Sequence, residues 1–335
     1  MLGNMMNGQL LISGLIEHAE KYHSDVEIVS RSVEGPIHRY TYTDAAKRSR
    51  KLANALTKLG LKEGDTVGTL AWNTFRHFEL YFGVSGIGCV VNTVNPRLFP
   101  EQLTYIINHA ENQYLFIDLS FVELVESLQG ELKGVKGFVI LTDRENMPDT
   151  KLENTICYEE LISDESEDFQ WPEFDENTAS SLCYTSGTTG NPKGVLYSHR
   201  STILHAWIVS SGNVAKVSSS SCILPVVPMF HVNAWGIPYA GAMFGAKLVF
   251  PGPALDGASL FELIDNEKPD LLMGVPTVWL GLLQHLRETN QTLDCVETAL
   301  VGGSAAPRAM IQEFEEEHDV FLMHGWGMTE MSPLG

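Results

Sequence analysis

Basic residues are scarce in this chain of 335 residues. Lysine and arginine together number 22, against 42 aspartates and glutamates, which gives a formal net charge of −20 at pH 7. Such a charge repels polyanions at long range, so the composition argues against a nucleic-acid partner or an anionic membrane surface. An anionic substrate would therefore have to be met by local cations or by a metal ion.

Cysteines and long apolar runs are also few. The five cysteines lie far apart without a Cys-x-x-Cys pair, which predicts free thiols in a reducing compartment, the cytoplasm, and excludes a disulfide framework or zinc site. The apolar run from Leu10 to Ile16 lacks a preceding basic region and continues into Glu17, as in an amphipathic helix and unlike a signal peptide. No run reaches the ~20 apolar residues that a membrane-spanning helix needs.

Short apolar segments alternate with helical patterns along most of the chain. Strands are expected at 66–72, 90–94, 114–117, 137–141, 222–231, 246–250 and 271–273. The alternation predicts an α/β fold with mainly parallel strands. Thr43 is predicted to cap the helix that follows the segment 39–42, and the strand at 222–231 is predicted to end at His231.

The expected domain organisation has three parts. Residues 1–150 form a first α/β block, 151–180 an acidic connector with one short helix, and 181–335 a second α/β block. Lys and Arg are missing between Lys151 and Lys193, and we interpret this acidic stretch as a solvated surface.

One loop combines hydroxyls, glycines and a cation. Residues 182–194 read LCYTSGTTGNPKG. Glycines let the backbone approach an anion closely, successive N–H groups can form an anion-binding nest, and Lys193 supplies a point charge. The spacing is not that of a Walker A loop, because Lys193 follows Pro192 and precedes Gly194. On composition alone, a phosphate-binding loop and a flexible turn remain alternatives.

Two further glycine-containing segments follow in order. They are GGSAAP at 302–307 and GWGMTE at 325–330. Together with the loop at 182–194, they resemble the motifs of the adenylate-forming superfamily, which includes acyl-CoA synthetases, luciferases and the adenylation domains of peptide synthetases. The resemblance extends over nearly the whole chain. It implies an N-terminal domain built from stacked, mainly parallel sheets flanked by helices.

The resemblance also implies an ATP site. The residues expected to bind ATP are Thr185, Ser186, Gly187, Thr188, Thr189, Gly190, Lys193, Gly302, Gly303, Ser304, Ala305, Gly325, Trp326, Gly327 and Thr329. Trp326 takes the place of a tyrosine that stacks on adenine. Thr329 is expected to contact the α-phosphate, and Thr185 and Glu330 to hold Mg²⁺, for which oxygen ligands are suited.

The acyl site is implied by a fourth segment. PMFHVNAW at 228–235 is most similar to fatty-acyl-CoA ligases, which implies that His231 lines the acyl-adenylate site and that Trp235 gates an acyl tunnel. Val232, Gly274, Val275 and Pro276 are expected nearby, and the expected catalytic residues are His231, Thr329 and Glu330. No carboxylate at 232–241 would pair with the ammonium of an amino acid, so an apolar acid is favoured.

The implied reaction has two steps. A carboxylate attacks the α-phosphorus of Mg·ATP to give acyl-AMP and pyrophosphate, and the thiol of coenzyme A then displaces AMP. A medium- or long-chain fatty acid is the expected substrate. The segment 324–333 also resembles 3-(methylthio)propionate CoA ligases, so a short thioether acid is the alternative.

The superfamily pattern continues beyond the Thr-Glu motif, through a ribose-binding aspartate and a hinge, to a small domain with the adenylation lysine. We therefore expect residues 1–335 to be an incomplete N-terminal domain, which binds ATP weakly without making acyl-CoA at a useful rate. A non-catalytic nucleotide-binding module is the alternative from another class. The oligomeric state stays open, with a homodimer among the alternatives.

Overall fold

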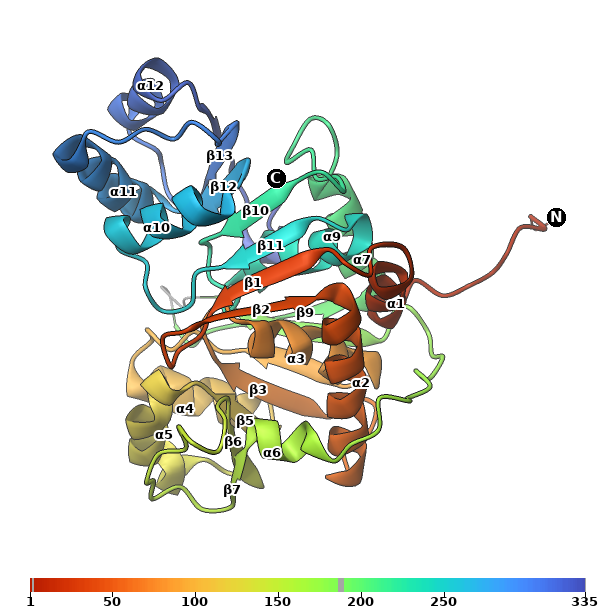
Figure 1. The fold of residues 1–335 in the computed structure, drawn as a ribbon. Coiled ribbons are helices and arrows are strands. Elements are labelled where there is room, and N and C mark those ends of the chain that lie inside the picture. Colours follow the sequence, from red (N-terminus) through yellow and green to blue (C-terminus); the bar gives the residue numbers. More distant parts are fainter. Residues whose placement is uncertain (2, 186–189, 335) are drawn as a thin grey trace.

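The computed structural model describes residues 1, 3–185 and 190–334 and contains two seven-stranded sheets (Figure 1). The first sheet has the order β7-β6-β5-β3-β4-β8-β9. Its strands are β3 (Thr66–Leu70), β4 (Val90–Thr93), β5 (Asn112–Ile117), β6 (Gly137–Ile140), β7 (Thr155–Cys157), β8 (Ala179–Tyr184) and β9 (Gly194–Ser198).

The second sheet has the order β14-β13-β12-β10-β11-β1-β2. Its strands are β1 (Glu27–Arg31), β2 (Ile37–Thr41), β10 (Cys222–Pro225), β11 (Lys247–Phe250), β12 (Leu271–Gly274), β13 (Thr298–Val301) and β14 (Phe321–His324). Each sheet is parallel except at one edge. In the first sheet β8 pairs antiparallel with β9, and in the second sheet β1 pairs antiparallel with β2. The predicted α/β fold with mainly parallel sheets is confirmed.

Helices lie between the sheets and on both outer faces. The largest buried cluster joins the inner faces of the two sheets through α1 (Ile12–Tyr22), α2 (Tyr42–Lys58), α3 (Phe75–Gly86), α7 (His199–Val209) and α9 (Ile237–Phe244). A second cluster lies under α10 (Gly257–Glu267), α11 (Pro276–Thr289) and α12 (Arg308–Glu317). A third lies under α4 (Pro100–His109) and α5 (Val122–Leu128), and Figure 1 shows these two outer layers apart from each other. None of the helices in the described ranges is both long and apolar enough to cross a bilayer.

The two sheets do not follow the blocks expected from the sequence. β1 and β2 precede residue 150 but belong to the second sheet, whereas β8 and β9 follow it and belong to the first. The acidic connector contributes β7 to the first sheet and carries α6 (Tyr158–Ser163). Boundaries at 150 and 181 therefore do not separate two independently paired sheets.

Thr41, and not Thr43, caps α2. The Thr41 hydroxyl accepts a hydrogen bond from the Asp44 backbone N–H at 3.3 Å, and the Asp44 carboxylate accepts one from the Thr41 N–H at 2.9 Å, which forms a capping box. Thr43 donates its hydroxyl to the Ser24 carbonyl instead. The predicted cap at Thr43 is wrong because the helix begins at Tyr42.

Candidate active site

A cavity of about 590 Å³ opens where the carboxyl ends of β12, β13 and β14 face the end of β8. Ligands of parallel α/β sheets commonly bind at this edge, because the loops that follow neighbouring strands meet there. The predicted site residues that line this cavity are Thr185, His231, Val232, Trp235, Gly302, Gly303, Gly325, Trp326, Gly327, Thr329 and Glu330. Segments far apart in the sequence therefore meet around one hollow.

The remaining predicted residues do not line this cavity. Ser186, Gly187, Thr188 and Thr189 lie outside the described residues. Gly190, Lys193, Gly274, Val275, Pro276, Ser304 and Ala305 are described but are not part of the cavity lining. A Cβ at Gly274 would lie 2.7 Å from Trp279, so this glycine allows α11 to pack closely on β12. Pro276 is the first residue of α11.

The base of the glycine-rich loop is closed by hydrogen bonds between Thr185 and Lys193. The Thr185 N–H donates to the Lys193 carbonyl at 3.0 Å, and the Lys193 N–H donates to the Thr185 hydroxyl at 3.3 Å. Thr185 lies directly after β8 and Lys193 directly before β9. The two strands therefore hold both ends of the loop at the edge of the cavity.

Glycines follow β13 and β14 along one wall of the cavity. A Cβ at Gly302 would lie 3.1 Å from the Trp235 ring and 3.3 Å from the Gly325 carbonyl. Gly303 has φ +79°, and a Cβ at Gly327 would overlap the Pro333 carbonyl. Side chains at Gly302 and Gly327 would run into these protein atoms, so glycine allows the turns after β13 and β14 to pack closely.

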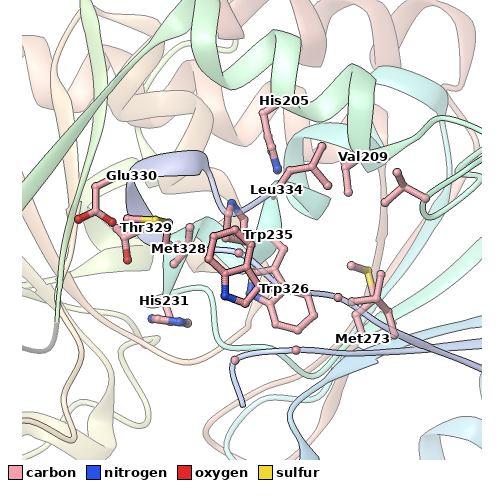
Figure 2. Close-up of a pocket in the computed structure, with 18 of the residues that line it drawn as sticks. His205, Val209, His231, Trp235, Met273, Trp326, Met328, Thr329, Glu330 and Leu334 are labelled. Atoms are coloured by element: carbon pink, nitrogen blue, oxygen red, sulfur yellow. The ribbon is translucent and has the colours of Figure 1, made fainter. Parts of the chain in front are cut away.

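Trp326, Thr329 and Glu330 follow β14 and face the cavity (Figure 2). The indole of Trp326 is 69% exposed, as a platform for a flat ligand requires. The Tyr197 hydroxyl donates a hydrogen bond to the Thr329 carbonyl, which ties this turn to β9.

The described residues contain no group of three or more His, Cys, Asp and Glu side chains arranged for a metal ion. Glu330 and Thr185 nevertheless present a carboxylate and a hydroxyl to one cavity. Mg²⁺ is typically held by one or two carboxylates together with substrate phosphates, so this sparse donor set fits it.

His231 does not end a strand. β10 stops at Pro225, and His231 follows a turn that begins where Val226 and Val227 both donate their N–H groups to the Met273 carbonyl. The prediction of a strand to residue 231 is wrong because β10 ends at Pro225, and Pro228 lacks the N–H group that would continue the sheet. The imidazole is accessible from the cavity, yet desolvation by the surrounding protein lowers its pKa, so it is neutral at pH 7.

The turn that presents His231 is held by the other sheet. Asn73, after β3, donates its side-chain amide to the Pro225 and Val227 carbonyls, both at 2.8 Å, and accepts from the Met229 N–H at 2.6 Å. The Tyr81 hydroxyl donates to the Met229 carbonyl at 2.5 Å. The sequence reading missed Asn73, because nothing local distinguishes it from a surface asparagine.

Replacing Asn73 by alanine is expected to lower the free energy of unfolding by about 2–4 kcal/mol, since buried carbonyls and an N–H lose their partners. Chemical denaturation measures the change. Asn54→Ala is the matched control, because Asn54 also donates to two carbonyls, those of Ser166 and Asp168, but at the surface. Equal losses in the two variants would contradict a special role for Asn73.

The segment after His231 is a left-handed turn. Val232, Asn233, Ala234 and Trp235 have φ between 46° and 54°, and Gly236 has φ 77°. This conformation costs non-glycine residues roughly 1–2 kcal/mol each, so it persists only where surrounding contacts impose it. Asn233 provides such contacts, because its amide donates to the Ser181 hydroxyl at 2.7 Å and accepts from the Cys183 thiol at 3.3 Å. The turn places the buried Trp235 indole against Gly302.

Much of the cavity lining is apolar. It includes Val209, Val214, Phe230, Met273, Leu300, Met323 and Leu334. Figure 2 shows Val209, Met273 and Leu334 around the two tryptophans, away from Glu330. One hollow thus combines a polar end at Thr329 and Glu330 with an apolar end, an arrangement suited to an amphipathic ligand.

Comparison with known proteins identifies relatives along the full chain. It is 52% identical over 335 residues to the 3-methylmercaptopropionyl-CoA ligase of Ruegeria lacuscaerulensis, covering 100% of this chain and 62% of that protein. It is 50% identical to the medium-chain-fatty-acid–CoA ligase of Ectopseudomonas oleovorans, covering 100% of this chain and 61% of that protein. It is 44% identical to the long-chain-fatty-acid–CoA ligase of Thermus thermophilus, covering 98% of this chain and 59% of that protein. The chain thus spans about three fifths of the length of these relatives.

Solved structures share the fold. The anthranilate CoA ligase AuaEII, in complex with anthranoyl-AMP, superposes with a TM-score of 0.87 at 22% identity, covering 100% of this chain and 63% of that one. A long-chain-fatty-acid-CoA ligase from Archaeoglobus fulgidus superposes with a TM-score of 0.85 at 20% identity, covering 100% of this chain and 67% of that one. The family model described as "AMP-binding enzyme" matches residues 15–335. The resemblance seen in the glycine-rich segments is therefore confirmed, and the chain belongs to the family of AMP-binding enzymes.

Proposed function

We propose that this chain forms the nucleotide- and acyl-binding part of an ATP-dependent acyl-CoA ligase. The observation that carries the proposal is the single cavity in which Thr185, the glycine-containing turns after β13 and β14, and Glu330 meet apolar side chains. Such a cavity can hold a nucleotide phosphate beside an apolar acid. The names of the relatives, which are acyl-CoA ligases, support this assignment.

The reaction assigns distinct tasks to the chain's residues. The acid's carboxylate attacks the α-phosphorus, the bond to the β-phosphate oxygen breaks, and pyrophosphate leaves. Thr329 and the loop ended by Thr185 and Lys193 would orient the phosphates, and the neutral His231 imidazole would adjoin the reacting carboxylate. Mg²⁺, held by Glu330 and Thr185, would neutralise phosphate charge. The thiol of coenzyme A then attacks the acyl carbon of acyl-AMP, and AMP leaves.

The proposed acid is a medium- or long-chain fatty acid, and a short thioether acid is the alternative. Two relatives, at 52% and 49% identity, are 3-methylmercaptopropionyl-CoA ligases, whereas a relative at 50% identity is named as a medium-chain-fatty-acid–CoA ligase. Both acids would lie against the same apolar end of the cavity. The alternative from another class is a nucleotide-binding module without turnover.

Two measurements separate these functions. Titration calorimetry of residues 1–335 with Mg·ATP and with non-hydrolysable acyl-adenylate analogues gives affinities for hexanoyl, palmitoyl and 3-(methylthio)propionyl groups. Pyrophosphate release with the same acids is then followed in the complete gene product. Tightest binding and fastest release with fatty acids support the main proposal. A sharp optimum at the thioether acid selects the alternative, and ATP binding without acid-dependent release leaves only the nucleotide-binding module.

Replacing Trp235 by alanine is expected to change the preference for acyl length. The indole lies between the left-handed turn and Gly302, so its removal extends the cavity at the acyl end. The affinity ratio of palmitoyl to hexanoyl adenylate analogues should rise at least ~10-fold, because each additional buried CH₂ contributes ~0.8 kcal/mol.

Two further variants make the Trp235 result interpretable. Trp235→Phe retains a ring in case the alanine variant unfolds, since buried Trp→Ala substitutions cost ~3–5 kcal/mol. Trp207→Ala is the control, because Trp207 on α7 is 64% exposed. If the palmitoyl-to-hexanoyl affinity ratio is unchanged in both variants, Trp235 is a core residue without influence on acyl length.

A further inference from the structure

A second, smaller cavity lies under the left-handed turn. Its volume is about 10 Å³, which is close to the ~10–15 Å³ of probe-occupied volume that one water molecule needs. The polar side chains that line it are Tyr197, Thr202, His205, Asn233, Tyr239 and Ser332. Six of the eight residues that line it are polar, whereas the dry voids of protein cores are lined by apolar residues.

Two polar atoms at this small cavity have no partner among the described residues. They are Nε2 of His205 and the hydroxyl of Tyr239, and both are buried away from solvent. Tyr197 and Asn233 are already engaged, with the Thr329 carbonyl and the Ser181 hydroxyl. Ser181 also lies close to Tyr239 without forming a hydrogen bond of acceptable geometry with it. Buried polar groups almost always have a partner, protein or water, so this pair requires an explanation.

The position of the His205 ring is fixed by Gly236. A Cβ at Gly236 would lie 2.6 Å from Nδ1 and 2.8 Å from Cε1 of His205, so this edge of the ring packs on the end of the turn. The ring borders both cavities, and Figure 2 shows it pointing from α7 toward Trp235 and Leu334. Burial lowers the pKa of His205 to about 4, so the imidazole is neutral at pH 7.

We propose that this cavity holds one structural water that bridges His205 Nε2 and the Tyr239 hydroxyl, and that the bridge fixes the left-handed turn beneath Trp235. His205 lies on α7, and Tyr239 lies on α9, which begins directly after the turn. A water between them supplies both missing hydrogen bonds and joins the two helices. His205 and Tyr239 are then positioning residues, which act on the ligand through Trp235.

The sign of a stability change tests the bridge. If the Tyr239 hydroxyl had no partner, Tyr239→Phe would raise the melting temperature, because an unsatisfied buried group would be removed. If a water bridges it, the same substitution should lower the melting temperature by about 2–4 °C. Tyr22→Phe, at a phenol that is 62% exposed, is the control and should cause no shift. A rise, or no change, for Tyr239→Phe overturns the proposal.

Coupling between the two side chains tests the bridge independently. His205→Gln keeps an amide group near the position of Nε2 and should retain most of the stability, whereas His205→Leu should not. The shift in melting temperature of the double variant His205→Leu, Tyr239→Phe should be smaller than the sum of the two single shifts, because either substitution alone already breaks the bridge. Additive shifts would mean that Tyr239 bonds elsewhere, with Ser181 for example, and would overturn the bridge. A crystal structure should show one water ~2.7–3.2 Å from both atoms.

The effect on the ligand rests on the proposed function, and its test is separate. Tyr239→Phe should change the palmitoyl-to-hexanoyl affinity ratio of adenylate analogues at least threefold, with AMP affinity unchanged. An unchanged ratio would leave the water without influence on Trp235. If no acyl analogue binds even the unmodified chain, the proposed function fails, while melting temperatures and crystallography still decide the bridge.

Discussion

Replacing Glu330 by glutamine is expected to lower acid-dependent pyrophosphate release about 100-fold or more in the complete gene product. The carboxylate faces the same cavity as Thr185 and Thr329, and we propose that it holds the Mg²⁺ that neutralises the phosphates. Glutamine keeps the size of the side chain but removes its charge. Losing one preorganised electrostatic contact of this kind typically lowers rates ~10²–10³-fold.

Magnesium dependence distinguishes this role from a structural one. The Mg²⁺ concentration for half-maximal release should rise at least ~10-fold in Glu330→Gln, and the melting temperature should stay unchanged, because this side chain is exposed. Glu316→Gln provides the control, since Glu316 is an exposed carboxylate on α12 and does not line the cavity. A Glu330→Gln variant with normal rate and normal Mg²⁺ dependence would remove this residue from the proposed metal site.

Glu159→Ala is expected to destabilise the fold by about 3–5 kcal/mol. Glu159 accepts two hydrogen bonds from Arg48, both at 3.0 Å, and one from Arg76 at 2.7 Å. Arg76 also pairs with Glu34 and Arg48 with Glu79, whose side chain is fully buried. Removing Glu159 leaves each largely buried guanidinium with one carboxylate partner and without the hydrogen bonds to Glu159. Glu159→Gln retains one acceptor and should lose less.

The loss in Glu159→Ala should shrink in acid. Burial favours a higher pKa for Glu159, but attraction to Arg48 and Arg76 outweighs it and holds the pKa below the usual value of 4.5. A depressed pKa contributes stability above the unfolded-state pKa, and this contribution disappears as pH falls through the folded-state pKa. The difference from the unmodified chain, measured by chemical denaturation, should therefore be smaller at pH 3 than at pH 7.

Glu160→Ala is the matched control for this pair. Glu160 pairs with Arg144, and the two side chains are 50% and 76% exposed. Exposed pairs of this kind contribute at most about 1 kcal/mol. A Glu160→Ala loss as large as that of Glu159→Ala would show that the buried network has no special importance.

Local patterns were enough to predict the fold class. Strands such as β6 and β12 are short, apolar and bounded by turns or helices, so their pattern is visible in a few residues. The glycine segments after β13 and β14 were equally visible, and they lie together because parallel strands end at one edge.

Features that depend on distant partners could not be predicted. Asn73 is recognisable as a positioning residue only once the turn from Pro225 to Met229 lies against it. The apolar run at 222–231 resembles a strand, but Pro225 and Pro228 and the contacts of Asn73 convert its second half into a turn. The left-handed turn at 232–235 carries no glycine that would signal it. In each case the local preference is overruled by tertiary contacts.

The exchange of edge strands between the sheets constrains the order of folding during synthesis. Ile28 in β1 pairs with Leu248 in β11, so the N-terminal hairpin leaves the ribosome long before its parallel neighbour exists. Contacts with such large sequence separation form late, because loop closure opposes them entropically. During this interval β1 presents an open edge, a place where a chaperone or another nascent chain can pair.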